Sequence, residues 1–388
     1  PAVSSTGPPE LPRWIRASVW SSARNPGAPA PIAPAQPARP RILYPSAPGS
    51  FVDLVAGARH GVVAIRASSP VKSGPAAMFP GAPEATADVA LGTGFLIERS
   101  EMGGGDPAGS AGGAGGKAPR GIETQGVFVL TTDHIASAAP ELRVVLPDRR
   151  DVPARLVGRD VRLDLALLAV DPLGFAPLPL GSSDELQVGE WLVVLGDPFG
   201  DEVSAAVGVV SATGRDAAGL LVAGGAPGFR ALLQTDARIH RGNSGGPVLD
   251  TAGQVVGVAV ATSDRPGELS FAIPISRVKD ILDGLRDGQV TRSWLGARVQ
   301  PVDPERAQAA GLSGSTGALI TEVRPGSPAA TAGLRVGDIL LQWAERDADP
   351  RSLPWIVAQA PAGRPVHVVL WRDRARVELS VVPQKLPE

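Results

Sequence analysis

The 388-residue sequence contains no cysteine, which excludes disulfide bonds, thiolate metal sites and a cysteine nucleophile. Aromatic residues make up 4% of the chain, with one tyrosine and only four histidines. The net charge is −2 and no basic cluster is present, so nothing indicates a nucleic-acid partner. No apolar run reaches the roughly 18 residues that a membrane-spanning helix needs. We therefore expect a globular protein that binds no nucleic acid, metal ion or cofactor.

Glycine and proline are abundant instead, with 47 and 39 residues. Twelve of the prolines lie within the first 48 residues. Such a tract cannot build the interior of a helix or sheet, so we expect residues 1–49 to form a Pro/Ala-rich disordered leader. Residue 1 is proline and no signal peptide is visible. We expect that the amino terminus has been trimmed and that a targeting segment was lost with it.

From residue 50 the composition changes to many short apolar runs that end at Gly, Pro or Asp. This pattern is typical of an all-β barrel or sandwich, and we assign it to a domain over 50–289. A Gly-rich stretch at 101–121 predicts a flexible loop within it. Helical spacing over 275–288 predicts a closing helix. Residues 290–388 predict a second, smaller β-rich domain with short helices.

One glycine-rich stretch raises a question of chemistry. In "TDARIHRGNSGGPVLD", three glycines surround Ser244. The simplest interpretation is a turn between two strands. The alternative is a nucleophilic serine, whose neighbouring N–H groups must face a reacting carbonyl and therefore need glycine dihedrals. That alternative requires a histidine base and an orienting carboxylate elsewhere in the chain.

The chain offers few candidates for these partners. His60 and His367 have the surroundings of ordinary sheet or surface residues, and His240 lies too near Ser244 in the chain to receive its proton. His134 follows the buried strand "GVFVLTTD", from whose end an imidazole can project into a cleft. Asp164 stands among leucines in "RLDLALLAV", where a carboxylate needs a hydrogen-bonded recipient. The order His134, Asp164, Ser244 is that of chymotrypsin-type barrels.

At this point a resemblance becomes specific. "TTDHIA", "DLALLAV" and "TDARIHRGNSGGPV" resemble the protease domain of the HtrA/DegP/DegS serine proteases. "LGDPFG", "GVVSATGR" and "SFAIPISRV" are similar to further segments of that family, and "GSPAATAGLRVGDILL" resembles its PDZ domain. The chain departs from the family at Asp133, at Asp197 and at His240, where the family often has other residues, but no triad member is lost.

The resemblance implies a mainly β fold, with a chymotrypsin-like double β-barrel followed by one PDZ domain. It implies that Ser244 attacks a peptide carbonyl while His134 takes the proton and Asp164 orients the imidazole. The N–H groups of Gly242 and Ser244 would form the oxyanion hole.

The resemblance also assigns residues around the catalytic centre. Ile239 and Leu269 would line a small apolar specificity pocket, although both could simply pack in the core. Arg238 stands where a trypsin has aspartate, so cleavage after Lys or Arg is not expected. Arg215 matches an arginine of a regulatory loop, although a lone arginine in a loop is more often only solvated.

In the second domain, Trp294, Leu295, Gly296 and Ala297 match the loop that binds a peptide carboxylate. The short helix around 353–359 would form the other groove wall. The alternative is a PDZ domain that only packs or regulates.

The expected function is a serine endopeptidase that degrades unfolded or damaged proteins in quality control, with peptide C-termini bound at the PDZ domain. A chaperone-like or scaffold protein that binds unfolded chains with little proteolysis is the alternative, and the context of Ser244 argues against a lipase. By analogy we expect a homotrimer with contacts from Tyr44 and Phe51. The expected location is periplasmic or otherwise extracytoplasmic, with membrane association through a segment that this sequence lacks as a further option.

Overall fold

The computed structural model describes most of the chain. The described residues are 49–70, 86–98, 127–171, 174–215, 231–262, 269–288, 290–312 and 314–387. The predicted leader up to residue 48 and the predicted flexible loop at 101–121 lie outside these ranges.

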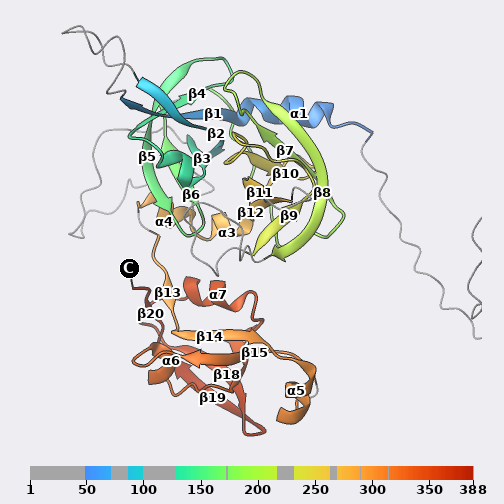
Figure 1. Ribbon diagram of the computed structural model, residues 1–388, viewed down its shortest axis with the longest axis vertical. Coiled ribbons are helices and arrows are strands. Elements are labelled where there is room, and N and C mark those ends of the chain that lie inside the picture. Colours follow the sequence, from blue (N-terminus) through green and yellow to red (C-terminus); the bar gives the residue numbers. More distant parts are fainter. Residues whose placement is uncertain are drawn as a thin grey trace, which may run out of the picture. The chain divides into compact units, whose positions relative to one another are not determined.

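The first barrel begins after a short helix, α1 (Val52–Ala58), and a 3₁₀ turn, η2 (Arg59–Gly61). Six strands close on themselves in the order β1-β2-β3-β6-β5-β4 (Figure 1). All neighbouring strands are antiparallel. Their bounds are β1 (Val62–Pro70), β2 (Thr86–Glu98), β3 (Val127–Thr131), β4 (Glu141–Val145), β5 (Asp151–Asp160) and β6 (Leu165–Ala169), with helix α2 (Asp133–Ala136) between β3 and β4.

The second barrel repeats this design, with the strand order β10-β11-β12-β9-β8-β7. Its strands are β7 (Trp191–Gly196), β8 (Ser204–Arg215), β9 (Leu232–Thr235), β10 (Pro247–Leu249), β11 (Val255–Thr262) and β12 (Ser270–Pro274). The expected chymotrypsin-like double barrel is confirmed.

Alternation of side chains along the strands builds both the barrel interiors and a shared core. On β2, Leu96 joins the cluster inside the first barrel, whereas Phe95 and Ile97 join a larger cluster. That larger cluster also contains Leu195 and Ile273 of the second barrel, so the two barrels bury one apolar layer between them. Successive strand residues face opposite sides, which is why one strand can serve both cores.

The prediction of a single closing helix over 275–288 is wrong in one respect. The segment forms two short helices, α3 (Ile275–Lys279) and α4 (Leu282–Arg286). The N–H of Ile281 bonds to the carbonyl of Val278, an i→i−3 contact that tightens the turn between them. A Cβ on Gly158 would overlap the backbone of Leu285, so α4 packs directly on β5.

The C-terminal domain is the expected PDZ domain. Its main sheet has the order β14-β15-β16-β18-β19, with β17 paired to β16, and β13 pairs with β20. The strands are β13 (Ser293–Trp294), β14 (Ala297–Pro301), β15 (Ala318–Val323), β16 (Ile339–Trp343), β17 (Arg346–Asp347), β18 (Val366–Arg372), β19 (Ala375–Val381) and β20 (Gln384–Lys385). Its helices are α5 (Pro304–Ala310), α6 (Pro328–Thr331) and α7 (Leu353–Gln359).

Helices α5 and α6 begin alike. The side chains of Asp303 and Ser327 cap their first turns, and a proline opens each helix. Both features satisfy or remove N–H groups that a helix start leaves unpaired. Throughout the described ranges, every helix falls short of the length and apolarity needed to cross a bilayer.

Candidate active site

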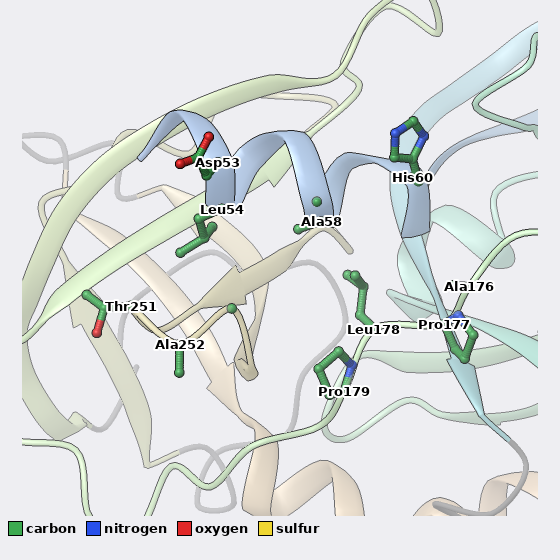
Figure 2. A pocket seen from close by; sticks show the side chains of 12 residues that line it. Asp53, Leu54, Ala58, His60, Ala176, Pro177, Leu178, Pro179, Thr251 and Ala252 are labelled. Carbon is green, nitrogen blue, oxygen red and sulfur yellow. The ribbon is translucent and has the colours of Figure 1, made fainter. Parts of the chain in front are cut away.

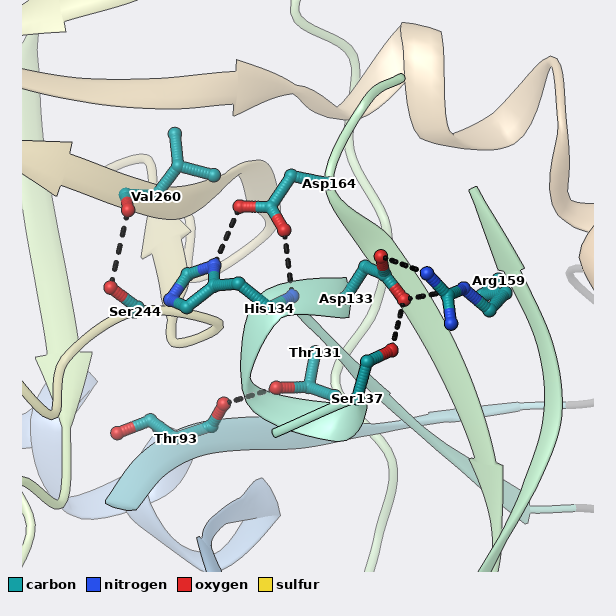
Figure 3. Close-up of polar contacts among 9 residues, drawn as sticks. All are labelled: Thr93, Thr131, Asp133, His134, Ser137, Arg159, Asp164, Ser244 and Val260. Atoms are coloured by element: carbon teal, nitrogen blue, oxygen red, sulfur yellow. Dashed lines mark hydrogen bonds and ion pairs between the residues drawn. The ribbon is translucent and has the colours of Figure 1, made fainter. Parts of the chain in front are cut away.

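His134 and Asp164 are held together from two elements of the first barrel. Nδ1 of His134 lies 2.7 Å from Oδ2 of Asp164, and the His134 backbone N–H donates to Oδ1 at 2.8 Å (Figure 3). Asp164 is 2% exposed. Because an ionised carboxylate only accepts hydrogen bonds, the ring proton belongs on Nδ1, and Nε2 is left to accept a proton.

The backbone at Asp164 is unusual. Its φ is 60°, in the left-handed region that costs most side chains about 1–2 kcal/mol. The preceding turn is fastened by Asp160, whose Oδ1 accepts the N–H groups of Arg162 at 2.9 Å and Leu163 at 3.0 Å. Asp160 in turn forms an ion pair with Arg292, and both side chains are buried. A side chain from the segment that leads into the PDZ domain thus contacts the residue that fastens the turn before Asp164.

Ser244 lies in the loop that enters β10. Its hydroxyl donates to the carbonyl of Val260 at 3.2 Å. Figure 3 draws the ring of His134 between Ser244 and Asp164. Rotation of the serine side chain would turn the hydroxyl from Val260 towards the ring, since catalytic hydrogen bonds often form only when substrate is bound.

The N–H groups around Ser244 divide into two sets. Asn243 donates to the carbonyl of His240 at 3.0 Å, and Gly245 donates to that of Ala259 at 2.7 Å. Over the described ranges, the N–H groups of Gly242 and Ser244 have no hydrogen-bond partner in the chain. These are the two donors that the sequence assigns to an oxyanion hole.

Glycine is required at two positions of this loop. Gly242 has a φ of 90°, and a Cβ there would overlap Pro198. Gly245 has a φ of 87°, and a Cβ there would overlap Thr93 and Thr131. Both positions thus combine a left-handed backbone with close approach of a neighbouring chain.

Sequence reasoning missed the contacts of Asp133, the buried residue before His134. Nε of Arg159 lies 2.9 Å from one of its carboxylate oxygens, Nη2 donates to the other at 3.0 Å, and the Ser137 hydroxyl donates at 2.7 Å. Burial raises the pKa of Asp133, and the hydrogen bond from Ser137 and the charge of Arg159 partly oppose this. The sequence did place Arg159 at the end of a predicted strand, but it could not tell which side of the strand the arginine side chain faces.

The other predicted residues lie in different environments. Ile239 is 1% exposed and belongs to the core of the second barrel, whereas Leu269 is 38% exposed. Arg215 is exposed at the end of β8. The N–H of Ile239 donates to the hydroxyl of Ser270, the residue after Leu269, at 3.1 Å, and the roles of Ile239, Leu269 and Arg215 stay predictions. His240 is exposed, and His367 contacts Glu378 on the surface of the PDZ domain.

The segment 294–297 connects β13 to the edge strand β14. The carbonyls of Leu295 and Gly296 accept the N–H groups of Ala329 and Arg324. Their own N–H groups have no partner in the described part of the chain. Gly296 has a φ of 76°, and a Cβ there would overlap Ser327. The predicted carboxylate-binding loop thus offers two adjacent unpaired donors.

A pocket of about 450 Å³ lies apart from these sites, beneath α1 (Figure 2). Its walls include Leu54, His60, Leu178, Pro179 and Thr251. None of the predicted site residues lines it. Among the described residues, no group of three or more histidine and carboxylate side chains is arranged to hold a metal ion.

Comparisons with family models and curated proteins agree with this architecture. Residues 92–258 match the trypsin-like peptidase domain, and residues 319–342 match the PDZ domain. A probable periplasmic serine endoprotease DegP-like of Marinomonas sp. (strain MWYL1) is 39% identical over 265 residues, which are 67% of this chain and 55% of that protein. The protein of the same name from Rhizobium meliloti (strain 1021) is 36% identical over 275 residues, 68% of this chain and 53% of the relative. The chain thus spans about half the length of these curated relatives.

Solved structures show the same arrangement over a larger share of the chain. The HtrA-type protease AlgW with decapeptide has a TM-score of 0.65 and 28% identity, covering 87% of this chain and 99% of its own. The same protease with tripeptide has a TM-score of 0.67 and 28% identity, covering 87% of this chain and 98% of its own. With its two barrels, the His134–Asp164 pair and the PDZ domain that follows, the chain is a trypsin-like peptidase domain joined to a PDZ domain, and the proteins it is similar to are HtrA- and DegP-like serine proteases.

Proposed function

We propose that this chain is a serine endopeptidase in which Ser244, His134 and Asp164 form the catalytic triad. The observation that carries the proposal is the hydrogen-bonded His134–Asp164 pair, with a ring nitrogen free to serve as base. Ser244 would attack the peptide carbonyl, and His134 would take its proton and return it to the leaving amine. Asp164 would hold the tautomer and stabilise the imidazolium.

The two unpaired N–H groups of Gly242 and Ser244 would bind the negative oxygen that develops on the attacked carbonyl. Their neighbours Asn243 and Gly245 are fastened to backbone carbonyls, so the two free donors sit on a loop held from both sides. Such preorganised donors are worth about 10²–10³ in kcat each.

We propose unfolded or damaged proteins as substrates. The position that confers Lys/Arg specificity on trypsins carries the exposed Arg238. A cation there disfavours basic side chains of the substrate, so cleavage after small apolar residues such as Val or Ala is expected.

At the PDZ domain we propose capture of peptide C-termini. Strand β14 pairs only with β15 in the described part of this sheet, so its other edge can receive an added strand. The unpaired N–H groups of Leu295 and Gly296 precede that edge and suit a terminal carboxylate. AlgW, a similar protein, has been solved with a decapeptide and with a tripeptide.

A homotrimer and an extracytoplasmic location complete the proposal. The ring centroids of Phe51 and Trp191 lie 5.9 Å apart with the rings tilted by 58°, and Val52 and Val188, close to them in the sequence, are 70% and 66% exposed. A surface through which copies of the chain associate needs exposed apolar side chains such as these. The relatives are named periplasmic, which supports the location.

The deciding experiment follows cleavage of fluorescein-labelled β-casein by the parent chain, Ser244→Ala, His134→Ala and His240→Ala. Ser244→Ala and His134→Ala should each lose nearly all activity, since triad effects are not additive. His240→Ala should keep much of it. Undiminished cleavage by a clean Ser244→Ala preparation would refute the nucleophile assignment. Suppression of aggregation without cleavage in the parent would favour the chaperone alternative instead.

A further inference from the structure

Thr93 is a fully buried residue of β2, in the first barrel, yet its hydrogen bonds reach the loop of Ser244 in the second barrel. Its N–H donates to the carbonyl of Ser244 at 2.9 Å, and its hydroxyl donates to the carbonyl of Gly242 at 2.7 Å. The same hydroxyl accepts the N–H of Asp197 at 2.9 Å. Its carbonyl accepts the hydroxyl of Thr131 at 2.7 Å (Figure 3). Every polar group of Thr93 is therefore used.

These bonds complete the attachment of two peptide units. The unit between Gly242 and Asn243 is held at its oxygen by the Thr93 hydroxyl and at its N–H by the carbonyl of His240. The unit between Ser244 and Gly245 is held at its oxygen by the Thr93 N–H and at its N–H by the carbonyl of Ala259. The unpaired N–H of Ser244 lies on the peptide unit between these two.

The hydroxyl also reaches the other side of Gly242. A Cβ on Gly242 would overlap Pro198, which follows Asp197, the residue whose N–H the Thr93 hydroxyl accepts. One oxygen atom thus joins the Gly242 peptide to the segment packed against it. Without that oxygen, the buried N–H of Asp197 and the carbonyl of Gly242 would both lose a partner, and each loss favours a rearranged loop.

We propose that Thr93 is a positioning residue of the oxyanion hole, whose hydroxyl holds Gly242 so that the N–H groups of Gly242 and Ser244 converge on the reacting oxygen. The inference rests on the proposed function, because it assumes that Ser244 is the nucleophile. It assigns to the first barrel a direct part in binding the transition state. A displacement of about 1 Å in such donors is enough to lower the rate by about 10²-fold.

The test compares Thr93→Val, which keeps the shape and removes the hydroxyl, with Thr93→Ser, which keeps the hydroxyl. The substrate is fluorescein-labelled β-casein, and the full chain is used throughout. Thr93→Val should lower kcat roughly 10–100-fold while KM changes less than about threefold, because the hole acts on the transition state and not on the bound substrate. Thr93→Ser should stay within about threefold of the parent.

A peptide boronate that ends in valine provides the second measurement, since its tetrahedral adduct needs the same donors. Its inhibition constant should rise in Thr93→Val by about the factor that kcat falls. Thr235→Val is the matched control, because Thr235 is buried and its hydroxyl accepts one backbone N–H, that of Ala237. Thr235→Val should lower the free energy of unfolding, but it should not lower kcat selectively while KM stays nearly unchanged.

If Thr93→Val fails to fold, Thr93→Cys replaces it, because a thiol is a weak donor in the same place. Its kcat should then fall about 3–10-fold with KM unchanged. Equal kcat in the Thr93→Val, Thr93→Ser and parent proteins would overturn the assignment and leave the proposed function intact. A parent as inactive as Ser244→Ala would overturn both.

Discussion

Replacement of Arg292 by methionine should destabilise the protein strongly, although this residue lies outside both barrels. Nη2 of Arg292 is 2.5 Å from Oδ2 of Asp160, and the two side chains are 5% and 1% exposed. Methionine fills much of the same space but leaves a carboxylate that is almost completely buried without its cation. Removal of one partner from such a pair costs roughly 3–5 kcal/mol.

The loss should be largely recovered when the charge of Asp160 is removed as well. In the double variant Asp160→Asn, Arg292→Met, the asparagine oxygen can still accept the N–H groups of Arg162 and Leu163. The double variant should therefore cost about 2–3 kcal/mol less than the sum of the two single variants. Arg298→Met is the matched control, since its pair with Glu322 has side chains that are 68% and 50% exposed. Pairs of that kind contribute about 0–1 kcal/mol.

The assay is urea unfolding of the parent and the four variants, followed by far-ultraviolet circular dichroism, with casein cleavage measured in parallel below the transition. Because the Asp160 turn places Asp164, the activity of Arg292→Met should fall by more than the folded fraction explains. The reasoning is refuted if Arg292→Met unfolds at the same urea concentration as Arg298→Met. It is equally refuted if the two single losses simply add in the double variant.

Three further predictions concern other contacts. Asp133 has a pKa above its ordinary value of 3.8, so its ionisation opposes folding. Its contribution to the free energy of unfolding is most favourable below pH 3.8 and is lost as the pH rises through the folded-state pKa. Asp133→Asn should remove this decline, and denaturant unfolding of both proteins at a series of pH values measures it. Gly245→Ala should cost roughly 2–4 kcal/mol and abolish casein cleavage, from a left-handed φ and an overlap with Thr93, and unchanged unfolding would contradict this. Peptides with a free apolar C-terminus should bind the loop at 294–297 more tightly than their amides, by calorimetry, and equal affinities would remove the carboxylate claim.

Much of the fold could be predicted because its signals are local. Short apolar runs that end at turn residues predict strands, and the runs quoted around His134 and Asp164 are the barrel strands β3 and β6. The pairing of His134 with Asp164 was also accessible. Only four histidines are present, and a carboxylate between leucines needs a partner inside the protein.

The supports of the site could not be predicted, because they join residues that are distant in the chain. Thr93 and Gly242 are 149 positions apart, and Thr93 and Asp197 are 104 apart. Their contact depends on how two barrels meet, which no periodicity in the sequence encodes. The break between α3 and α4 could not be predicted either. The helical spacing of apolar residues continues across Asp280 and Ile281, although the backbone hydrogen bonds change there.

Different strands support the two halves of the candidate site. The last two residues of β5 support the half of the site that contains His134 and Asp164. Arg159 binds the carboxylate of Asp133, the residue before His134, and Asp160 fastens the turn that carries Asp164. Their side chains face opposite sides, as neighbours on a strand do, so one strand end reaches both the residue before His134 and the turn before Asp164. Thr93 holds the nucleophile half from a different strand. Because Arg292 pairs with Asp160, a change in the segment before the PDZ domain should act first on the turn that carries Asp164.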